Sequence, residues 1–277
     1  MVERKKTKSS AKARKPRRKK AAKKQTPLWL KYVLALIIII GVASFGFYRF
    51  FVQPYAYRWK TCAGRQAYNV CIPYNYSVHG IDISHYQGII DWQQLSAHQQ
   101  GEFPLSFIFM KATEGSDLED PTFTQHFDSA RAHGFLRGAY HFFVPGTDAR
   151  RQAQFFIGKV HLQTGDLPPV LDVETKGRSK KALQEGVKTW LDVVEAYYGV
   201  KPIIYTSYKF KESYLNDAVF NDYPYWIAHY YVDSVHYKGH WEFWQHTDVG
   251  SVPGIKENVD LNVFNGTLEQ LKRYTLK

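Results

Sequence analysis

Two carboxylates, Asp172 and Glu174, follow an apolar run and are separated only by Val173. Side chains alternate along a strand, so both acids are expected on one face while the valine points the other way. Glycoside hydrolysis requires such a pair: one acid must hold a proton for the leaving oxygen, and a neighbouring negative charge in a partly desolvated cleft raises its pKa. An isolated pair more often marks a strand end with two solvated acids, so the interpretation depends on the surrounding elements.

Short strand-like runs alternate with helical patterns from Gly80 onward. The runs occupy residues 80–84, 105–115, 135–143, 167–174 and 201–207. Helices are predicted at 91–99, 121–133, 147–161 and 179–198, with Thr147 and Ser179 as N-caps and Gly134 and Gly199 as C-terminal caps. Repeated strand–helix units of about 30 residues predict a parallel sheet.

The last third of the chain has strand-like segments at 223–230, 240–247 and 257–264. They lie about 17 residues apart, which is too close for a full crossover helix between each pair. The predicted fold class is therefore α/β: a TIM-like barrel of five strand–helix units followed by three strands. No Gly/Ser/Pro-rich linker interrupts residues 80–277, and the barrel is expected to occupy residues 78–277 as one domain.

Catalytic residues of parallel barrels sit at the carboxyl ends of the strands. Nearly every predicted strand here ends in a polar or aromatic residue: Asp82, Glu114, His141, Asp172 with Glu174, Tyr205, Tyr230, Gln245, and Asp260 with Asn262. Further aromatic residues that suit sugar rings lie beside them, namely Tyr86, Trp92, Tyr140, Trp226 and Trp244, although Trp92 and Tyr140 are expected in the core. Acids on four strands in register predict one site at a common rim.

Eight segments of this region resemble glycoside hydrolase family 25, the Chalaropsis-type lysozymes. They are GIDISHYQGIIDW (80–92), FIFMKATEG (107–115), GAYHFF (138–143), PVLDVE (169–174), PIIYTS (202–207), YWIAHY (225–230), WQHT (244–247) and VDLNVF (259–264). The segments occur in family order and at family-like spacing. The resemblance covers about residues 78 to 270, and residues 1–77 lie outside it.

The resemblance implies a barrel of five strand–helix units and three strands that hydrolyses the β-1,4 bond between N-acetylmuramic acid and N-acetylglucosamine in peptidoglycan. Glu174 corresponds to the general acid/base, Asp172 to the carboxylate that stabilises the intermediate, and Asp82 and Asp260 to the other two acids. His246 stands where the family often has Tyr, which leaves the nearby substrate subsite in question.

The mechanism predicted from these residues is net retention. Glu174 protonates the glycosidic oxygen and later activates water, while Asp172 either attacks the anomeric carbon or steers the 2-acetamido group of the substrate to do so. The residues expected to bind the glycan strand are Tyr86, Glu114, His141, Tyr205, Trp226, Tyr230, Trp244, Gln245 and Asn262.

Two other functions remain open at the level of sequence. A chitinase-like hydrolase would also use an acid cluster at strand ends, but its longer D-x-x-D-x-D-x-E pattern is absent before Asp172. A membrane-anchored glycan-binding protein could keep the fold without turnover, because fold does not guarantee function. The presence of all four acids argues for the enzyme.

The amino terminus predicts a membrane anchor. Residues 1–27 form a basic tail, with 13 Lys or Arg between Arg4 and Lys24, and are expected to be disordered. Residues 28–52 form one predicted transmembrane helix, with 17 uncharged residues between Lys31 and Arg49. A cleaved signal peptide is the alternative, but the run ends in aromatic residues rather than in a small-residue cleavage site. The positive-inside rule places the tail in the cytoplasm and the barrel outside it, as a single-pass protein.

The net charge of +12 resembles that of a nucleic-acid-binding protein, but it is unevenly distributed. Residues 1–53 hold 15 of the 37 Lys and Arg and one of the 25 Asp and Glu, so the remainder carries 22 basic and 24 acidic residues. The sequence therefore predicts no nucleic-acid partner. It shows no phosphate loop or metal-ligand spacing, so no cofactor or metal is expected, and it does not fix the oligomeric state.

Residues 53–77 are interpreted as a spacer that contains both cysteines of the chain, Cys62 and Cys71. Two thiols at this separation in an exported segment predict a small disulfide-closed loop. Free buried cysteines are the alternative, and two cysteines without a nearby pair of histidines do not make a zinc site.

Overall fold

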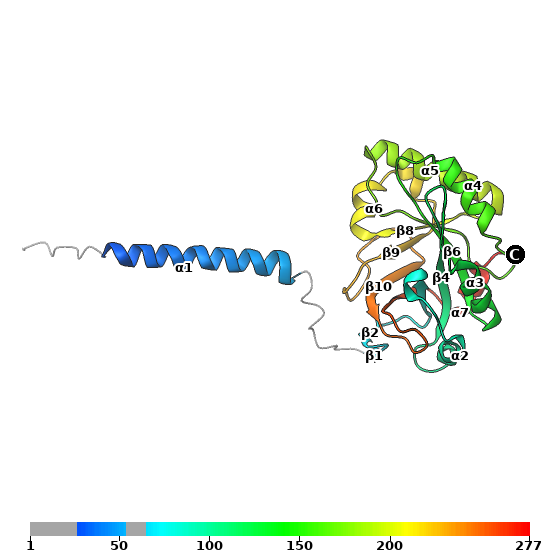
Figure 1. Ribbon diagram of the computed structural model, residues 1–277, viewed down its shortest axis with the longest axis horizontal. Helices are drawn as coiled ribbons and strands as arrows, with labels where there is room; N and C mark the ends of the chain where they lie inside the picture. The colour runs from blue at the N-terminus through cyan, green and yellow to red at the C-terminus, as the bar shows by residue number, and fades with distance from the viewer. Residues whose placement is uncertain (1–26, 54–64) are drawn as a thin grey trace, which may run out of the picture. The chain divides into compact units, whose positions relative to one another are not determined.

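The computed structural model describes residues 27–53 and 65–277, and the chain divides into two compact units between Trp59 and Lys60. The predicted basic tail lies outside the described residues, apart from Pro27. The first unit contains helix α1 (Leu28–Phe47), which continues into a wider turn at Tyr48–Val52 (Figure 1). This stretch of 25 residues is long and apolar enough to cross a membrane. It is compatible with either a signal anchor or a membrane span.

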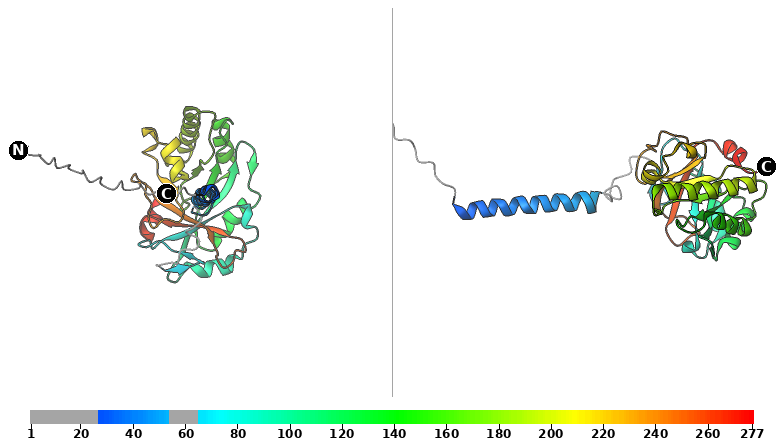
Figure 2. Two further views of the ribbon diagram at one scale, coloured as in Figure 1. Left: turned by 90° about the vertical axis from the view of Figure 1, so that its left-hand side faces the viewer. Right: turned by 90° about the horizontal axis from the view of Figure 1, so that it is seen from above.

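The second unit is a closed barrel of eight strands with helices around it, as predicted (Figures 1 and 2). The barrel strands are β3 (His79–Ile83), β4 (Leu105–Glu114), β6 (Leu136–Phe142), β7 (Val170–Asp172), β8 (Ile203–Ser207), β9 (Tyr225–Ala228), β10 (Phe243–Gly250) and β11 (Val259–Phe264). They pair in the order β3-β11-β10-β9-β8-β7-β6-β4, and pairing of β3 with β4 closes the ring. The short strand β5 (Leu118–Glu119) only extends the edge of β4.

Strand β11 departs from the expected barrel of parallel strands. The other seven barrel strands run parallel to one another, whereas β11 is antiparallel to both β10 and β3. Residues 251–258 join β10 to β11 without a helix, and a connection of this kind brings the chain back in the opposite direction. Asp260 therefore lies near the amino end of β11, and it reaches the rim because it pairs directly with Asp82.

Helices of unequal length surround the barrel. They are α2 (Trp92–Ser96), α3 (Phe123–Ala132), α4 (Ala149–Lys159), α5 (Lys180–Tyr198), α6 (Tyr208–Tyr214) and α7 (Leu268–Tyr274). Helices α2 and α6 have only five and seven residues. Helix α7 follows the last strand, although the sequence predicts no helix after the last three strands. Ser179 caps α5 as predicted. The N-cap of α4 is Asp148 and not Thr147, because the Asp148 carboxylate accepts the Arg151 N–H.

Two hydrophobic clusters lie on the two faces of the barrel wall. The inner cluster fills the barrel and includes Phe107, Phe109, Val170, Phe243 and Phe264, while the outer cluster packs the wall against the helices. Gly80 and Gly138 face the interior, where a Cβ on either would lie 2.5 Å from ring atoms of Phe107 or Phe109. These two glycines make room for the phenylalanine layer.

A hairpin of β1 (Gln66–Ala67) and β2 (Val70–Cys71) packs against the barrel, within the segment predicted from the sequence to be a spacer. Ile72 is buried in the outer cluster, and the Tyr68 hydroxyl donates to the Phe103 carbonyl at 2.8 Å. The Tyr68 carbonyl accepts the Ser251 N–H, also at 2.8 Å. Cys71 is disulfide-bonded, while Cys62, the other predicted half of the loop, lies outside the described residues.

Candidate active site

A cavity of about 300 Å³ opens at the carboxyl ends of the parallel strands. The four predicted acids, Asp82, Asp172, Glu174 and Asp260, all line it. The other residues that line it are Ile83, Ser84, Tyr86, Gln87, Lys111, Tyr140, Phe142, Tyr205, Trp226, Tyr230 and Gln245. The structure thus brings acids from the first, fourth and last barrel strands to one hollow.

Asp172 and Glu174 differ in exposure although one residue separates them. Asp172 is the last residue of β7 and is buried, whereas Glu174 lies just beyond the strand and is exposed. Val173 between them is buried in the outer cluster. Its N–H donates to the Tyr205 carbonyl at 2.9 Å, and its carbonyl accepts the Thr206 hydroxyl at 2.7 Å. These bonds continue the strand alternation that turns both acids into the cavity.

Asp82 is held by two side-chain amides. Its Oδ1 accepts hydrogen bonds from Nδ2 of Asn262 at 2.7 Å and from Nε2 of Gln245 at 2.8 Å. Trp226 Nε1 donates to Oδ1 of Asn262 at 2.8 Å. An indole nitrogen can only donate, so this bond fixes the orientation of the Asn262 amide and points its NH₂ group at Asp82.

Two tyrosines orient Gln245 in the same way. The hydroxyls of Tyr205 and Tyr230 both donate to its Oε1, at 2.7 and 2.6 Å, which leaves its Nε2 for Asp82. A ring of donors from β8, β9, β10 and β11 therefore converges on a single carboxylate. A network satisfied in this way holds its members in one arrangement.

Burial raises the pKa of all four acids. The pKa of Asp82 rises to about 7, against the opposing effect of its two amide donors. The pKa of Asp260 rises to about 9, with additional contributions from the charges of Asp82, Asp248 and Glu174. The pKa of Asp172 lies well above its usual value because of burial first and the charges of Glu174 and Asp82 second. The cluster therefore retains protons near neutral pH.

Although Glu174 is exposed at the mouth, the surrounding protein withdraws part of its carboxyl from water, which raises its pKa, and a hydrogen bond with the Tyr205 hydroxyl partly offsets this rise. The sequence predicts that neighbouring acids raise this pKa, but withdrawal from water is what raises it. The charge of Glu174 in turn raises the pKa values of Asp172 and Asp82. Glu174 thus combines access to solvent at the mouth with a tendency to hold its proton, as a general acid requires.

Five of the nine predicted glycan-binding residues line the cavity: Tyr86, Tyr205, Trp226, Tyr230 and Gln245. Tyr86 is exposed at the rim, and its ring lies 4.2 Å from that of His85. Asp120 holds His85 through the backbone N–H and through Nδ1, both at 2.9 Å. The ring of Tyr86 therefore packs against a histidine that Asp120 holds in place.

The other four predicted binding residues lie elsewhere. His141 is buried on the outer face, where it bonds Thr113 and Gln152 and stacks on Trp190. Trp244 also faces outward and donates to the His229 carbonyl. Glu114 contacts Lys111 and pairs with Phe142 across β4 and β6 without lining the cavity itself, and Asn262 supports Asp82 from within the barrel. His246, the departure from the family pattern, is buried beside Trp244 and does not line the cavity.

The sequence reasoning missed Lys111, Phe142, Ser84 and Gln87 and placed Tyr140 in the core. The alternation of side chains along the strands could have identified three of these residues. Lys111 lies an even number of positions from the inward-facing Phe107 and Phe109 in β4, so it faces the same side. Tyr140 and Phe142 are related in the same way to Gly138 in β6. Ser84 and Gln87 belong to a capping box that begins a short turn after β3, which strand alternation does not describe.

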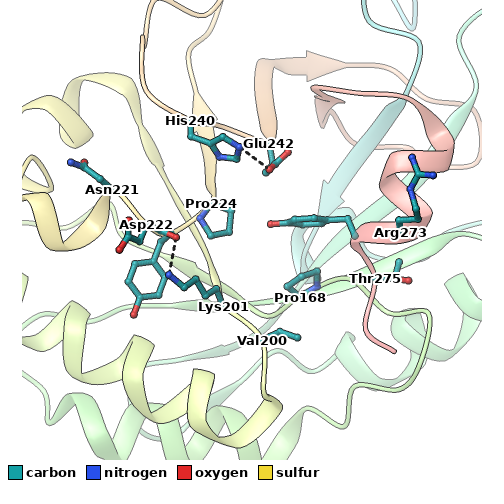
Figure 3. Close-up of a pocket in the computed structure, with 12 residues that line it drawn as sticks. Pro168, Val200, Lys201, Asn221, Asp222, Pro224, His240, Glu242, Arg273 and Thr275 are labelled. Carbon is teal, nitrogen blue, oxygen red and sulfur yellow. Dashed lines mark hydrogen bonds and ion pairs between the residues drawn. The ribbon is translucent and has the colours of Figure 1, made fainter.

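A larger hollow of about 610 Å³ lies at the opposite end of the barrel (Figure 3). Its lining comes from the segments that precede β7, β8, β9 and β10 and from the end of α7, and includes Lys201, Glu242 and Arg273. In barrels of this kind, that end supports stability while catalysis is confined to the other. None of the four clustered acids lines it.

A barrel with paired carboxyls of raised pKa at its strand ends is the arrangement of carboxylate-dependent glycosidases. No group of metal-ligating side chains occurs within residues 27–53 and 65–277. The glycosyl hydrolases family 25 matches residues 81–255, which is more than half of the chain. The chain belongs to this family and is a glycosidase.

Similar proteins cover most of the barrel. The chain is 45% identical over 211 residues to the uncharacterised protein YegX of Escherichia coli K12, covering 76% of this chain and 77% of that protein. It is 31% identical over 210 residues to lysozyme M1 of Streptomyces globisporus, covering 70% of each. The structure of a family 25 glycosyl hydrolase from Bacillus anthracis superposes with a TM-score of 0.67 at 30% identity, covering 74% of this chain and 96% of that one.

Proposed function

We propose that this protein is a peptidoglycan N-acetylmuramidase that cleaves the β-1,4 bond between N-acetylmuramic acid and N-acetylglucosamine with net retention. The observation that carries the proposal is that an exposed Glu174 shares one cavity with the buried Asp172 and Asp82. The relative from Streptomyces globisporus is named a lysozyme, which supports the substrate class.

Glu174 is proposed as the general acid and then the general base. Its raised pKa keeps a proton available for the leaving oxygen, and its exposed position lets the proton be replaced after each turnover. Once the aglycone leaves, the same carboxylate can take a proton from the water that completes hydrolysis.

Asp172 is proposed as the carboxylate that handles the anomeric centre. Its Oδ1 is buried and has no hydrogen-bond partner among the described residues. Both candidate routes need such a free oxygen, either to attack the anomeric carbon or to accept the N–H of the 2-acetamido group as that group attacks. A covalent glycosyl adduct on Asp172, trapped with a slow fluorosugar substrate and found by mass spectrometry, would select direct attack. Inhibition by a thiazoline analogue without any adduct would select substrate assistance.

Tyr86, Trp226 and Tyr230 are proposed to position the sugar rings. Tyr86 offers an exposed ring at the rim, where a sugar face can stack. Trp226 is almost fully buried between Phe109 and Tyr205, with ring centroids at 4.6 and 4.5 Å, so it supports the floor of the cavity. The exposed ring is therefore expected to contribute more to substrate affinity, and the buried one more to the shape of the site.

The helix Leu28–Val52 is proposed to remain uncleaved and to hold the barrel outside the cytoplasm as a single-pass protein. The basic tail supports this orientation through the positive-inside rule. Peptidoglycan lies on that side of the membrane, so orientation and proposed substrate agree.

The experiment that tests the catalytic assignment compares Glu174→Gln with the unchanged protein on purified peptidoglycan. Loss of the proton donor is expected to lower the rate of muropeptide release by at least about 100-fold. Glu185→Gln, at an exposed position on α5, is the matched control and should leave the rate unchanged. Retention of most activity by Glu174→Gln would refute the assignment.

A further inference from the structure

Lys111 is the only lysine or arginine among the described residues that line the cavity, and it shares that cavity with four carboxyls. Its side chain is only 11% exposed. A nearly buried ammonium carries a large desolvation cost, which must be offset by a partner. The proposed reaction assigns no role to this cation.

Glu114 and Phe142 hold the ammonium in place. The Lys111 Nζ lies 2.6 Å from Glu114 Oε2 and 5.1 Å from the centre of the Phe142 ring. Glu114 is the only hydrogen-bond acceptor of this ammonium among the described residues, although an ammonium has three N–H donors. Glu114 therefore fixes the ammonium of a residue that lines the cavity.

The register of the sheet brings this charge near Asp172. Lys111 pairs with Tyr140 across β4 and β6, and Phe142 pairs with Asp172 across β6 and β7. Lys111 lowers the pKa of Asp172, whereas Glu114 raises it. The titratable groups that face Asp172 from the surrounding strands are Asp82, Lys111, Glu114, Tyr140, Glu174 and Tyr205. Lys111 is the only cation in this set.

We propose that Lys111 is a positioning residue that keeps the Asp172 carboxylate charged in the substrate-covered cavity, and that Glu114 sets the strength of this effect. The proposal rests on the proposed function, because either route at the anomeric centre requires a charged Asp172. Substrate binding displaces water, which makes the charged form of a buried acid still less favourable. A fixed ammonium that is not displaced with the water offsets this change.

The two members of the pair should have opposite effects on the pH dependence of kcat. Lys111→Met removes the cation, so the acidic limb of the profile should move to higher pH by roughly one unit. Glu114→Gln leaves the cation less neutralised, so the same limb should move to lower pH. Lys111→Arg keeps the charge and should keep the limb close to that of the unchanged protein. A purely structural ion pair would shift the limb in the same direction, or not at all, whichever partner is removed.

Carbon-13 NMR of carboxyl-labelled aspartate provides a readout that does not depend on turnover. Asp172, assigned through the loss of its signal in Asp172→Asn, should titrate at higher pH in Lys111→Met and at lower pH in Glu114→Gln. Lys159→Met breaks the separate ion pair with Glu119 at 2.7 Å and should change neither readout. If Lys111→Met does not fold, the downward shift in Glu114→Gln decides the matter alone.

The outcomes separate the two proposals. If the titration of Asp172 moves in opposite directions in Lys111→Met and Glu114→Gln, but the unchanged protein releases no muropeptides, the proposed function is refuted. The effect of Lys111 and Glu114 on the charge of Asp172 is then still supported. Muropeptide release with unopposed or absent shifts would overturn the role of Lys111 and leave the proposed function standing.

Discussion

A single residue separates Asp172 from Glu174, yet their environments differ enough for the two carboxyls to take different roles in glycoside hydrolysis. Asp172 is buried at the end of β7, and its Oδ1 has no hydrogen-bond partner in the described part of the chain, while Glu174 is exposed at the mouth of the cavity. Withdrawal from water raises both pKa values. Two carboxyls with different access to solvent can take different roles in one reaction.

Asp260 provides a prediction for stability at the scale of one residue. Its pKa is about 9 in the fold against an ordinary value of 3.8, so between these values the folded state binds more protons than the unfolded state. The free energy of unfolding should therefore fall as pH rises through this window. Asp260→Asn cannot ionise, so it should be more stable than the unchanged protein at pH 8–9, by roughly 0.5–2 kcal/mol, and nearly equal to it at pH 4.

Urea denaturation at the two pH values measures this difference, and muropeptide release should fall in the same variant. Asp117→Asn, at an exposed position, is the control and should show no pH-dependent gain. Equal stability of Asp260→Asn and the unchanged protein at pH 9 would contradict the cost assigned to this buried charge.

At the scale of elements, the inward-facing glycines Gly80 and Gly138 let their strands pack directly against the rings of Phe107 and Phe109. Gly138→Ala would place a Cβ 2.5 Å from the ring of Phe109, so the variant should lose about 1–3 kcal/mol of unfolding free energy. Gly158→Ala, in α4 with no atom of the described residues within 4 Å of its Cβ, is the control and should gain about 0.5–1 kcal/mol. Denaturation midpoints measure both, and a neutral Gly138→Ala would show that the layer can shift.

The sequence predicted the barrel and the convergence of the four acids because alternation and strand–helix spacing are local signals. It missed the direction of β11, since hydrophobic alternation is the same for a strand read in either direction. It placed His141 and Trp244 at the site because both lie near strand ends, but their parity turns them to the outer face. Parity also reveals Lys111, once Phe107 and Phe109 are recognised as facing inward.

The Asp82 network lay beyond sequence reasoning for a different reason. Asn262 and Gln245 are far from Asp82 along the chain, and their amide orientations depend on Trp226, Tyr205 and Tyr230. Only the closure of the barrel brings β3 beside β11. Side-chain networks that cross a closed sheet depend on register, which local patterns do not specify.

At the scale of the whole molecule, the hairpin β1–β2 belongs to the barrel and not to a free tether. A fragment that begins at Lys60 keeps Tyr68 and Ile72 and should fold and release muropeptides like the full chain. A fragment that begins at Val78 exposes the surface that these residues cover and should be less stable by roughly 2–5 kcal/mol. Thermal unfolding of the two fragments compares them directly, and equal melting temperatures would contradict a structural role for the hairpin.

The proposed topology predicts how the chain responds to protease in spheroplasts. An epitope at the carboxyl terminus should be digested without detergent, and one at the amino terminus should be digested only after lysis. A cytoplasmic protein in the same cells serves as the control for intact membranes. Protection of the carboxyl terminus would reverse the orientation, and a shortened amino terminus in the mature protein would indicate cleavage after the apolar helix.

The identity of the new reducing end tests the central claim most directly. Purified peptidoglycan is digested with the full-length protein in detergent, the products are reduced with borohydride, and the reduced sugar is identified by mass spectrometry. A muramidase leaves reduced N-acetylmuramic acid, and the Glu174→Gln control should leave none. Reduced N-acetylglucosamine, or binding to peptidoglycan without any new reducing end, would contradict the account.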